Sequence, residues 1–317
     1  MLDPVLMFFL LGLTAGLLRS ELRLPAAVYD LVSMLLLLAI GLKGGVELAK
    51  QPFSALAGQA LAVMAMGTLL ALLAFPVLRF VGRLPRADAA SIAAHYGSVS
   101  VATYAVAVAY FSSRQVYFEE HMPFLLAVLE IPAILVGILL ARGVSREMHL
   151  GKVAHEVFLG KGIVLLVGGL LIGWAAHPDA LMSITPLFFD LFKGILALFL
   201  LEMGLITATQ FGSLRLHGPF LVFFGIGMPL VSSIVGIALG IMLGLSLGGT
   251  AMLGILAASA SYIAVPAAMR ISVPEANPTL SLAVSLGVTF PFNVLLGIPL
   301  YHTMAAHAFA MNGGFAL

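Results

Sequence analysis

Long apolar runs follow one another along this chain with only short polar segments between them, and this succession restricts the possible folds most. Hydrophobic residues make up 62% of the 317 positions and charged residues 9%, whereas soluble domains carry roughly 25% charged residues. A helix needs about 20 apolar residues to cross a membrane. The sequence therefore predicts an all-α polytopic membrane protein, because no polar stretch is long enough to fold into a soluble domain.

Ten runs are long enough to be counted as spans. We expect ten transmembrane helices at about 3–18, 28–48, 53–80, 87–111, 122–141, 160–176, 187–208, 217–244, 249–269 and 279–308. The first run is not expected to be a signal peptide, because its charges follow the apolar stretch instead of preceding it. The chain has no Cys, which excludes disulfides and thiolate metal sites, and its net charge of +1 gives no attraction to nucleic acid.

Short motifs recur at an interval of about 160 residues. Four pairs occur in the same order: Gly12/Gly16 with Gly169/Gly173, Y-D-L at 29–31 with F-D-L at 189–191, Ser98/Ser100 with Ser259/Ser261, and E-I-P-A-I-L-V-G at 130–137 with T-F-P-F-N-V-L-L-G at 289–297. We divide the chain into a first repeat at 1–142, a cytoplasmic connecting loop at 143–160 and a second repeat at 161–317. Each repeat holds five spans, an odd number, so the second enters the membrane from the opposite side. This predicts an inverted-topology repeat.

The basic residues set the expected orientation, because cytoplasmic loops are enriched in Lys and Arg. Ten spans place four basic residues on one side, namely Lys43, Lys50, Arg114 and Lys193. The other side receives the remaining eleven: Arg19, Arg23, Arg79, Arg83, Arg86, Arg142, Arg146, Lys152, Lys161, Arg215 and Arg270. We therefore expect the second side to be cytoplasmic and both termini to lie outside.

Two of the spans carry polar residues in their middle. Span four contains H-Y-G-S-V-S-V-A-T at 95–103, and span nine contains A-A-S-A-S-Y-I-A-V-P at 257–266. Interrupted segments at matching places in two repeats are the best sequence sign of a transporter's binding site. We expect both spans to be broken there, so that the second half-helices begin at mid-membrane, near Ser98–Val101 and Ser259–Tyr262, and approach each other from opposite sides.

Two converging helix N-termini suit a small monoanion. Each N-terminus offers free N–H groups and the equivalent of roughly half a positive charge, so two of them match about one negative charge. Buried carboxylates are expensive at this depth and indicate function. A hard cation such as sodium prefers oxygen ligands. If spans four, five, nine and ten pack together, the candidate sodium ligands are Ser98, Ser100, Glu130, Thr289 and Asn293.

Several of these residues also have plainer structural explanations. A single S-x-S pair in a membrane helix usually bonds its own backbone or lets helices approach, and only the second copy favours a functional reading. Asp30, Asp88 and Asp190 are explained by positions near helix starts. For His95 we expect a hydrogen-bonded structural role in preference to proton relay.

At this point the motifs show a likeness to a known family. A-A-H-Y-G-S-V-S-V-A-T at 93–103 and the long stretch at 261–294, S-Y-I-A-V-P-A-A-M-R-I-S-V-P-E-A-N-P-T-L-S-L-A-V-S-L-G-V-T-F-P-F-N-V, closely resemble the sodium-dependent bicarbonate transporter family, known from cyanobacterial carbon-concentrating systems. The resemblance extends over nearly the whole chain. It implies a sodium/bicarbonate symporter of the plasma (inner) membrane, with sodium as the co-transported ion.

The resemblance also implies an architecture and a site. It predicts a core domain from spans three to five and eight to ten, a gate or scaffold domain from spans one, two, six and seven, elevator-type alternating access and a homotrimer. Carried over by position, the cradle for bicarbonate and sodium consists of Gly97, Ser98, Ser100, Ser259, Ser261 and Tyr262. A PII-like regulatory partner on the cytoplasmic face is also implied. The connecting loop here is shorter than in many family members, so the docking of that partner is left open.

Other functions are distinguished by their site chemistry. The main alternative is a sodium-coupled symporter of another small anion or an organic acid with the same fold. A sodium/proton antiporter is expected to carry adjacent core carboxylates, whereas Glu130 stands almost alone. A membrane hydrolase is disfavoured because the sequence has neither H-E-x-x-H nor G-x-S-x-G. A passive channel is disfavoured by broken helices in inverted repeats.

Overall fold

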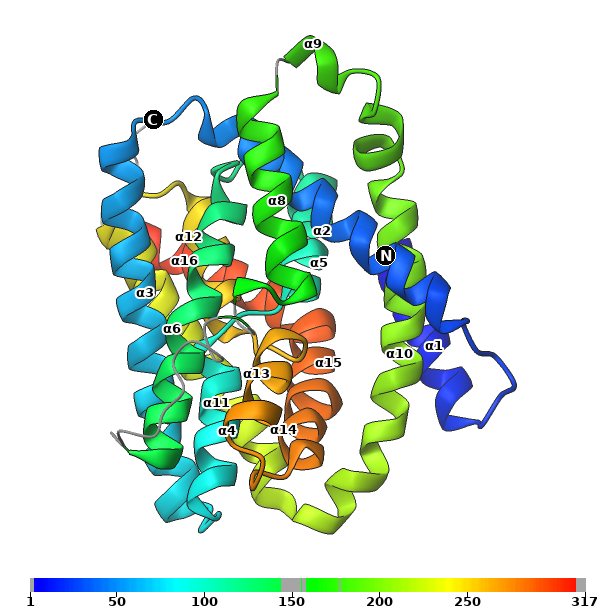
Figure 1. The fold of residues 1–317 in the computed structure, drawn as a ribbon, viewed down its shortest axis with the longest axis vertical. Coiled ribbons are helices and arrows are strands. Elements are labelled where there is room, and N and C mark those ends of the chain that lie inside the picture. The colour runs from blue at the N-terminus through cyan, green and yellow to red at the C-terminus, as the bar shows by residue number, and fades with distance from the viewer. Residues whose placement is uncertain (1–2, 144–154, 156–157, 177, 312–317) are drawn as a thin grey trace.

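The computed structural model describes residues 3–143, 155, 158–176 and 178–311, and these form helices joined by short connections, with no strand among them (Figure 1). The helices are α1 Pro4–Leu17, α2 Ala26–Leu48, α3 Phe53–Pro76, α4 Arg86–Gly97, α5 Val101–Ser113, α6 Met122–Arg142, α8 Lys161–Ala175, α9 Pro178–Leu181, α10 Phe192–His217, α11 Pro219–Met242, α12 Leu247–Ala258, α13 Ala264–Ser272, α14 Pro278–Val284, α15 Phe290–Phe292 and α16 Ile298–Met311. Four π-helical segments accompany them: η1 Val77–Val81, η2 Pro186–Asp190, η3 Ser285–Thr289 and η4 Asn293–Gly297. The all-α prediction is confirmed.

Seven helical stretches of the described chain are long and apolar enough to cross a membrane: Ala26–Leu48, Leu56–Val81, Arg86–Ser113, Met122–Arg142, Phe192–Gly212, Pro219–Met242 and Pro278–Met311. Three shorter apolar helices, α1, α8 and α12, coincide with the remaining expected runs. The protein is therefore a multi-pass membrane protein. The count of ten spans stays a prediction, since the three shorter helices do not reach spanning length by themselves.

Two helix pairs pack with their backbones in close contact, α1 along α10 and α2 along α8. Glycines make this approach possible: a Cβ atom at Gly12 would lie 1.9 Å from the carbonyl oxygen of Leu201, and one at Gly173 would lie 2.2 Å from that of Leu42. The GxxxG pairs read from the sequence thus lie at close helix contacts, as expected. In terms of the expected spans, span one packs on span seven and span two packs on span six.

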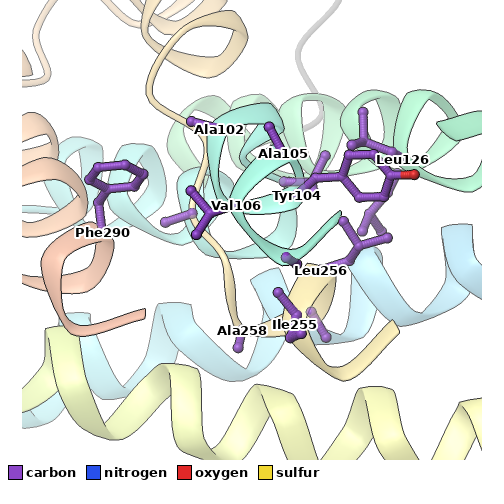
Figure 2. Close-up of a cluster of buried hydrophobic side chains, with 14 of the residues drawn as sticks. Ala102, Tyr104, Ala105, Val106, Leu126, Ile255, Leu256, Ala258 and Phe290 are labelled. Atoms are coloured by element: carbon purple, nitrogen blue, oxygen red, sulfur yellow. The ribbon is translucent and has the colours of Figure 1, made fainter. Parts of the chain in front are cut away.

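The remaining helices pack around α4, α5 and α12 in the middle of the molecule. α3, α4 and α6 pack on one another, and α12 packs on α11 and α16. Figure 2 shows Ala102, Tyr104, Ala105 and Val106 of α5 inside this packing, with Ile255, Leu256 and Ala258 of α12 nearby. Every residue of α4 from Asp88 to Gly97 is buried. Small side chains therefore bring α4, α5 and α12 together in the centre.

The predicted connecting loop at 143–160 lies largely outside the described residues. Its cytoplasmic placement and the proposed division into two repeats stay predictions.

Candidate functional site

The first break interrupts the chain between α4 and α5. α4 ends at Gly97, and the backbone is extended at Ser98 and Ser100 before α5 begins at Val101. The Ser100 Oγ accepts a hydrogen bond of 3.1 Å from the backbone N–H of Thr103, which is the standard capping geometry for a helix N-terminus. The prediction that span four is broken here is confirmed, and the second half-helix begins where it was expected.

The second break lies between α12 and α13. α12 ends at Ala258, residues Ser259–Ile263 are not helical, and α13 begins at Ala264. The Ser261 Oγ accepts a long hydrogen bond, 3.4 Å, from the backbone N–H of Val265. The predicted break is again confirmed, although the new helix starts slightly later than the expected Ser259–Tyr262. This break has five residues without helical hydrogen bonds, compared with three in the first.

The two breaks are hydrogen bonded to each other. The backbone N–H of Ser100 donates to the Ser259 Oγ at 2.9 Å, and the backbone N–H of Ser261 donates to the carbonyl oxygen of His95 at 2.9 Å. The ring Nδ1 of His95 bonds the carbonyl oxygen of Ser261. Two interruptions that are about 160 residues apart in the sequence therefore meet at one crossing, hereafter called the crossing.

The crossing is almost completely buried, and some of its polar atoms have no partner. Ser98, Ser100, Ser259 and Ser261 are each 3% exposed or less, and Tyr262 is 8% exposed. Within the described part of the chain, three buried polar atoms at the crossing have no hydrogen-bond partner: the Ser98 Oγ, the Tyr262 hydroxyl and the His95 Nε2. An unpaired polar atom in this setting costs free energy. These atoms are therefore the ones available to a ligand.

Gly97 lies against neighbouring helices at the end of α4. A Cβ atom at this position would be 2.6 Å from the carbonyl oxygen of Gly67 on α3 and 3.0 Å from the Cβ of Ala133 on α6. The absence of a side chain therefore permits the close packing of three helices immediately before the break. Its predicted contact with substrate stays a prediction.

Glu130 lies on α6, which packs against α4, the helix that leads into the first break. It is 5% exposed, and its Oε2 has no partner among the described residues. Because Gly97 faces Ala133 and the two helices run antiparallel, Glu130 lies about one turn further along α6, about 4.5 Å along the axis toward Met122. This places Glu130 at the depth of Ser98 to Val101.

The other two predicted sodium ligands already hold protein partners. The Thr289 Oγ1 donates to the carbonyl oxygen of Gly225 at 2.7 Å, so the Tyr96 hydroxyl, 2.5 Å away, donates to Thr289. The Asn293 Nδ2 donates to the carbonyl oxygen of Ala258 at 2.8 Å.

The Asn293 Oδ1 accepts from the Tyr301 hydroxyl, also at 2.8 Å. Asn293 thus pairs the last carbonyl of α12 before the second break, which would otherwise lack a helical partner. Sequence reasoning missed Tyr96 and Tyr301. Tyr96 lies inside the first motif, but nothing in the sequence marks Tyr301.

A cavity of about 410 Å³ lies between α2, α5 and the start of α10, and its rim carries Lys43, Glu120 and Lys193. Lys43 and Glu120 are 3.6 Å apart across it. A second cavity of about 20 Å³ is lined by the same three helices and by Ile263 of the second break. Both cavities thus border the same three helices, and the smaller one also borders the second break at Ile263.

The comparison with family models is decisive at this point. The model of the Na+-dependent bicarbonate transporter superfamily matches residues 4–306. The chain belongs to this superfamily. The match covers both breaks and nearly every described helix, and it confirms a transporter in preference to an enzyme. A comparison with curated proteins gave no match.

Proposed function

We propose that this protein is a sodium-dependent bicarbonate symporter of the plasma membrane that imports bicarbonate with the sodium gradient. The observation that carries the proposal is the crossing, where two helix breaks meet and leave the Ser98 Oγ and the Tyr262 hydroxyl unpaired in a buried position. The half-helices α5 and α13 both begin at this point. Their N–H groups and partial positive charges match one anionic charge, whereas a dianion would keep about one unit of charge uncompensated.

Sodium binds beside the anion in this proposal. Ser98, Ser100, Glu130, Thr289 and Asn293 are the candidate ligands. Of these, Ser98 and Glu130 keep an unpaired oxygen, and Glu130 supplies the only negative charge in the set. A cation bound to Glu130 reduces the cost of the buried carboxylate and of the incoming anion together. This mutual stabilisation is a physical basis for obligatory coupling.

Transport proceeds by an elevator-type movement of a core domain, spans three to five and eight to ten, against a gate domain. The gate consists of spans one, two, six and seven, and the close contacts of α1 with α10 and of α2 with α8 support a rigid unit. The charged rim with Lys43 and Lys193 faces the outside, since the arginine-rich ends face the cytoplasm. Both termini then lie outside, the repeats have inverted topology, and the gate domains assemble into a homotrimer.

Uptake into proteoliposomes tests the function. Purified protein is reconstituted, and radiolabelled bicarbonate uptake is measured with an inward sodium gradient and with potassium replacing sodium. We expect accumulation only with sodium. Equal uptake in both salts contradicts sodium coupling, and no uptake in either contradicts bicarbonate transport. Competition by small carboxylates then tests the alternative, a symporter of another small anion or an organic acid. Native mass measurement in lipid nanodiscs tests the trimer.

A further inference from the structure

His95 is placed at the crossing by contacts from both its backbone and its ring. It lies in the last turn of α4, one turn before Ser98, and its residue exposure is 0%. Its carbonyl oxygen accepts from the backbone N–H of Ser261, and its Nδ1 bonds the carbonyl oxygen of the same residue. The imidazole is therefore held in one orientation by the second break, while it belongs to the helix that precedes the first.

The contact with Ser261 fixes which ring nitrogen carries the proton. A carbonyl oxygen only accepts hydrogen bonds, so Nδ1 must be the donor. In a neutral imidazole the other nitrogen, Nε2, then has a free lone pair and acts only as an acceptor. Within the described chain, this buried Nε2 has no partner. Among the described residues no carboxylate hydrogen bonds to the ring, so a buried imidazolium would lack that compensation.

The other side-chain acceptors at the crossing are either engaged or able to donate as well as accept. The hydroxyl oxygens of Ser100, Ser259 and Ser261 already accept from backbone N–H groups. The free hydroxyls of Ser98 and Tyr262 both donate and accept, so they suit a protonated or an unprotonated oxygen equally. His95 Nε2 is different, because its tautomer allows it only to accept.

We propose that His95 Nε2 accepts the hydrogen bond from the O–H group of the transported bicarbonate and so selects a protonated planar monoanion. This inference rests on the proposed function, since it assigns one more substrate contact at the same site. The helix N-termini supply donors to the unprotonated oxygens of bicarbonate. The single O–H of bicarbonate needs an acceptor, and His95 provides it.

Nitrate is the informative competitor. It is also a planar trigonal monoanion with three oxygens, but it carries no proton. At the crossing, nitrate directs an oxygen lone pair against the lone pair of His95 Nε2 and leaves that nitrogen unpaired. A site built to hydrogen-bond a substrate hydroxyl rejects analogues that lack it far more strongly than an apolar pocket does. The wild-type protein is therefore expected to exclude nitrate.

The test begins with the unaltered protein. Sodium-dependent bicarbonate uptake into proteoliposomes is measured with increasing nitrate, and a hundred-fold excess of nitrate is expected to leave uptake unchanged, beyond the effect of matched chloride. If nitrate competes as well as bicarbonate binds, the inference is wrong, whatever any variant does. If the unaltered protein takes up no bicarbonate, the proposed function fails first, and the two failures are distinguished by this experiment.

The matched variants are His95→Asn and His95→Gln. An Asn amide nitrogen reaches the position of Nδ1 and keeps the donation to Ser261, but it places no atom at the position of Nε2. We expect the KM for bicarbonate to rise about tenfold or more, which is typical of a lost hydrogen bond to a charged group, with a smaller change in maximal rate. Nitrate should then compete measurably. In His95→Gln the amide oxygen reaches the Nε2 position, and part of the selectivity should return.

A purely structural role predicts a different pattern. In that case His95→Asn, which keeps the bond to Ser261, retains the wild-type KM and still excludes nitrate, and this result overturns the inference. A melting temperature equal to that of the unaltered protein verifies that the variant is folded. The inhibition by nitrate relative to the KM for bicarbonate is the deciding measurement, because a general loss of stability lowers bicarbonate uptake without making nitrate a competitor.

Discussion

The two breaks have similar sequences, but their serine hydroxyls differ in how they are hydrogen bonded. In the first break, the Ser98 Oγ has no partner among the described residues, and neither has the nearby His95 Nε2. In the second, Ser259 donates to the carbonyl oxygen of Leu256 and accepts from Ser100, and Ser261 caps α13. A sequence repeat therefore does not imply equal roles. The first break leaves the Ser98 hydroxyl free, whereas both serines of the second break hold the crossing together and only its Tyr262 hydroxyl has no described partner.

Length explains much of this difference. The first break leaves three residues outside helical geometry and the second leaves five, so the second has more backbone groups that need partners. These partners come from outside the break: His95 pairs both the N–H side and the carbonyl side of Ser261, and Asn293 pairs the carbonyl of Ala258. The second break is thus stabilised by residues from α4 and η4.

The largest effect is expected from Ser98→Ala in the first break. The Ser98 Oγ bonds no described protein group, so its removal breaks no internal contact and should leave the melting temperature of the ligand-free protein unchanged. A lost hydrogen bond to a charged ligand corresponds to about 1.5–3 kcal/mol, or roughly tenfold to a hundredfold weaker binding. Sodium-dependent bicarbonate uptake measures this. Full uptake in a folded Ser98→Ala protein removes Ser98 from the site.

Ser259→Ala should separate the second break from the first by its effect on stability. The change leaves the buried N–H of Ser100 without its acceptor, and a buried unsatisfied group costs about 1–3 kcal/mol. We expect a lower melting temperature as well as reduced uptake. Ser259→Thr, which keeps the hydroxyl, is the control for the hydrogen bond. A Ser259→Ala protein with unchanged melting temperature contradicts the proposed bracing role of the second break.

Tyr301→Phe tests the support behind the second break with a smaller perturbation. The change removes one hydroxyl, which donates to the Asn293 Oδ1, and retains the buried ring. The Asn293 Oδ1 then lacks this donor, and because a typical hydrogen bond contributes about 1 kcal/mol, a loss of that size is expected. Thermal unfolding in detergent measures it. The corresponding change at the first break, Tyr96→Phe, removes the donor to Thr289 and should have a similar cost.

Much of the fold was predictable because membranes restrict the possibilities. The lengths of the apolar runs predicted the helices. The S-x-S pairs predicted both interruptions, because hydroxyl groups and Gly are out of place in an otherwise apolar membrane helix. The GxxxG contacts were also found, since close approach needs small residues. Helix counting was less secure, because α1, α8 and α12 are shorter than a full span.

The partners of the site residues were not predictable in the same way. The bond from Tyr301 to Asn293 joins residues of one span that lie eight positions apart, and no motif in the sequence links them. The contact of His95 with Ser261 joins two repeats and depends on how the breaks cross. Sequence position gave the depth of Glu130, whereas its lack of a partner depends on packing between α4 and α6.

The ends of the broken spans that lie away from the crossing are joined by two further hydrogen bonds, at positions that correspond in the two motif copies. The Asp88 Oδ1 accepts from the backbone N–H of Asn277 at 2.7 Å, and the Glu119 Oε1 accepts from that of Ser246 at 2.6 Å. Asp88 and Ser246 begin the two broken spans, whereas Glu119 and Asn277 follow them. Asp88 corresponds to Ser246 and Glu119 to Asn277, each at an offset of 158 residues. In each pair the residue before residue 143 supplies the carboxylate and the later residue supplies the N–H donor.

These two ties should give the smallest effects and should act independently. Asp88→Ala and Glu119→Ala are each expected to lower stability by about 1 kcal/mol, the net contribution of a typical hydrogen bond. Glu119 should cost slightly more, since its Oε2 also accepts from the Ser246 hydroxyl at 3.1 Å. The two contacts lie at opposite ends of the spans, so the double variant should show the sum within about 0.5 kcal/mol. Glu275→Ala, which removes an exposed ion pair with Arg142, is the control and should change little. If the double variant loses clearly more stability than the two single variants together, the two breaks respond as one unit. The distinction between a first break that leaves Ser98 free and a second break that holds the crossing together would then be wrong.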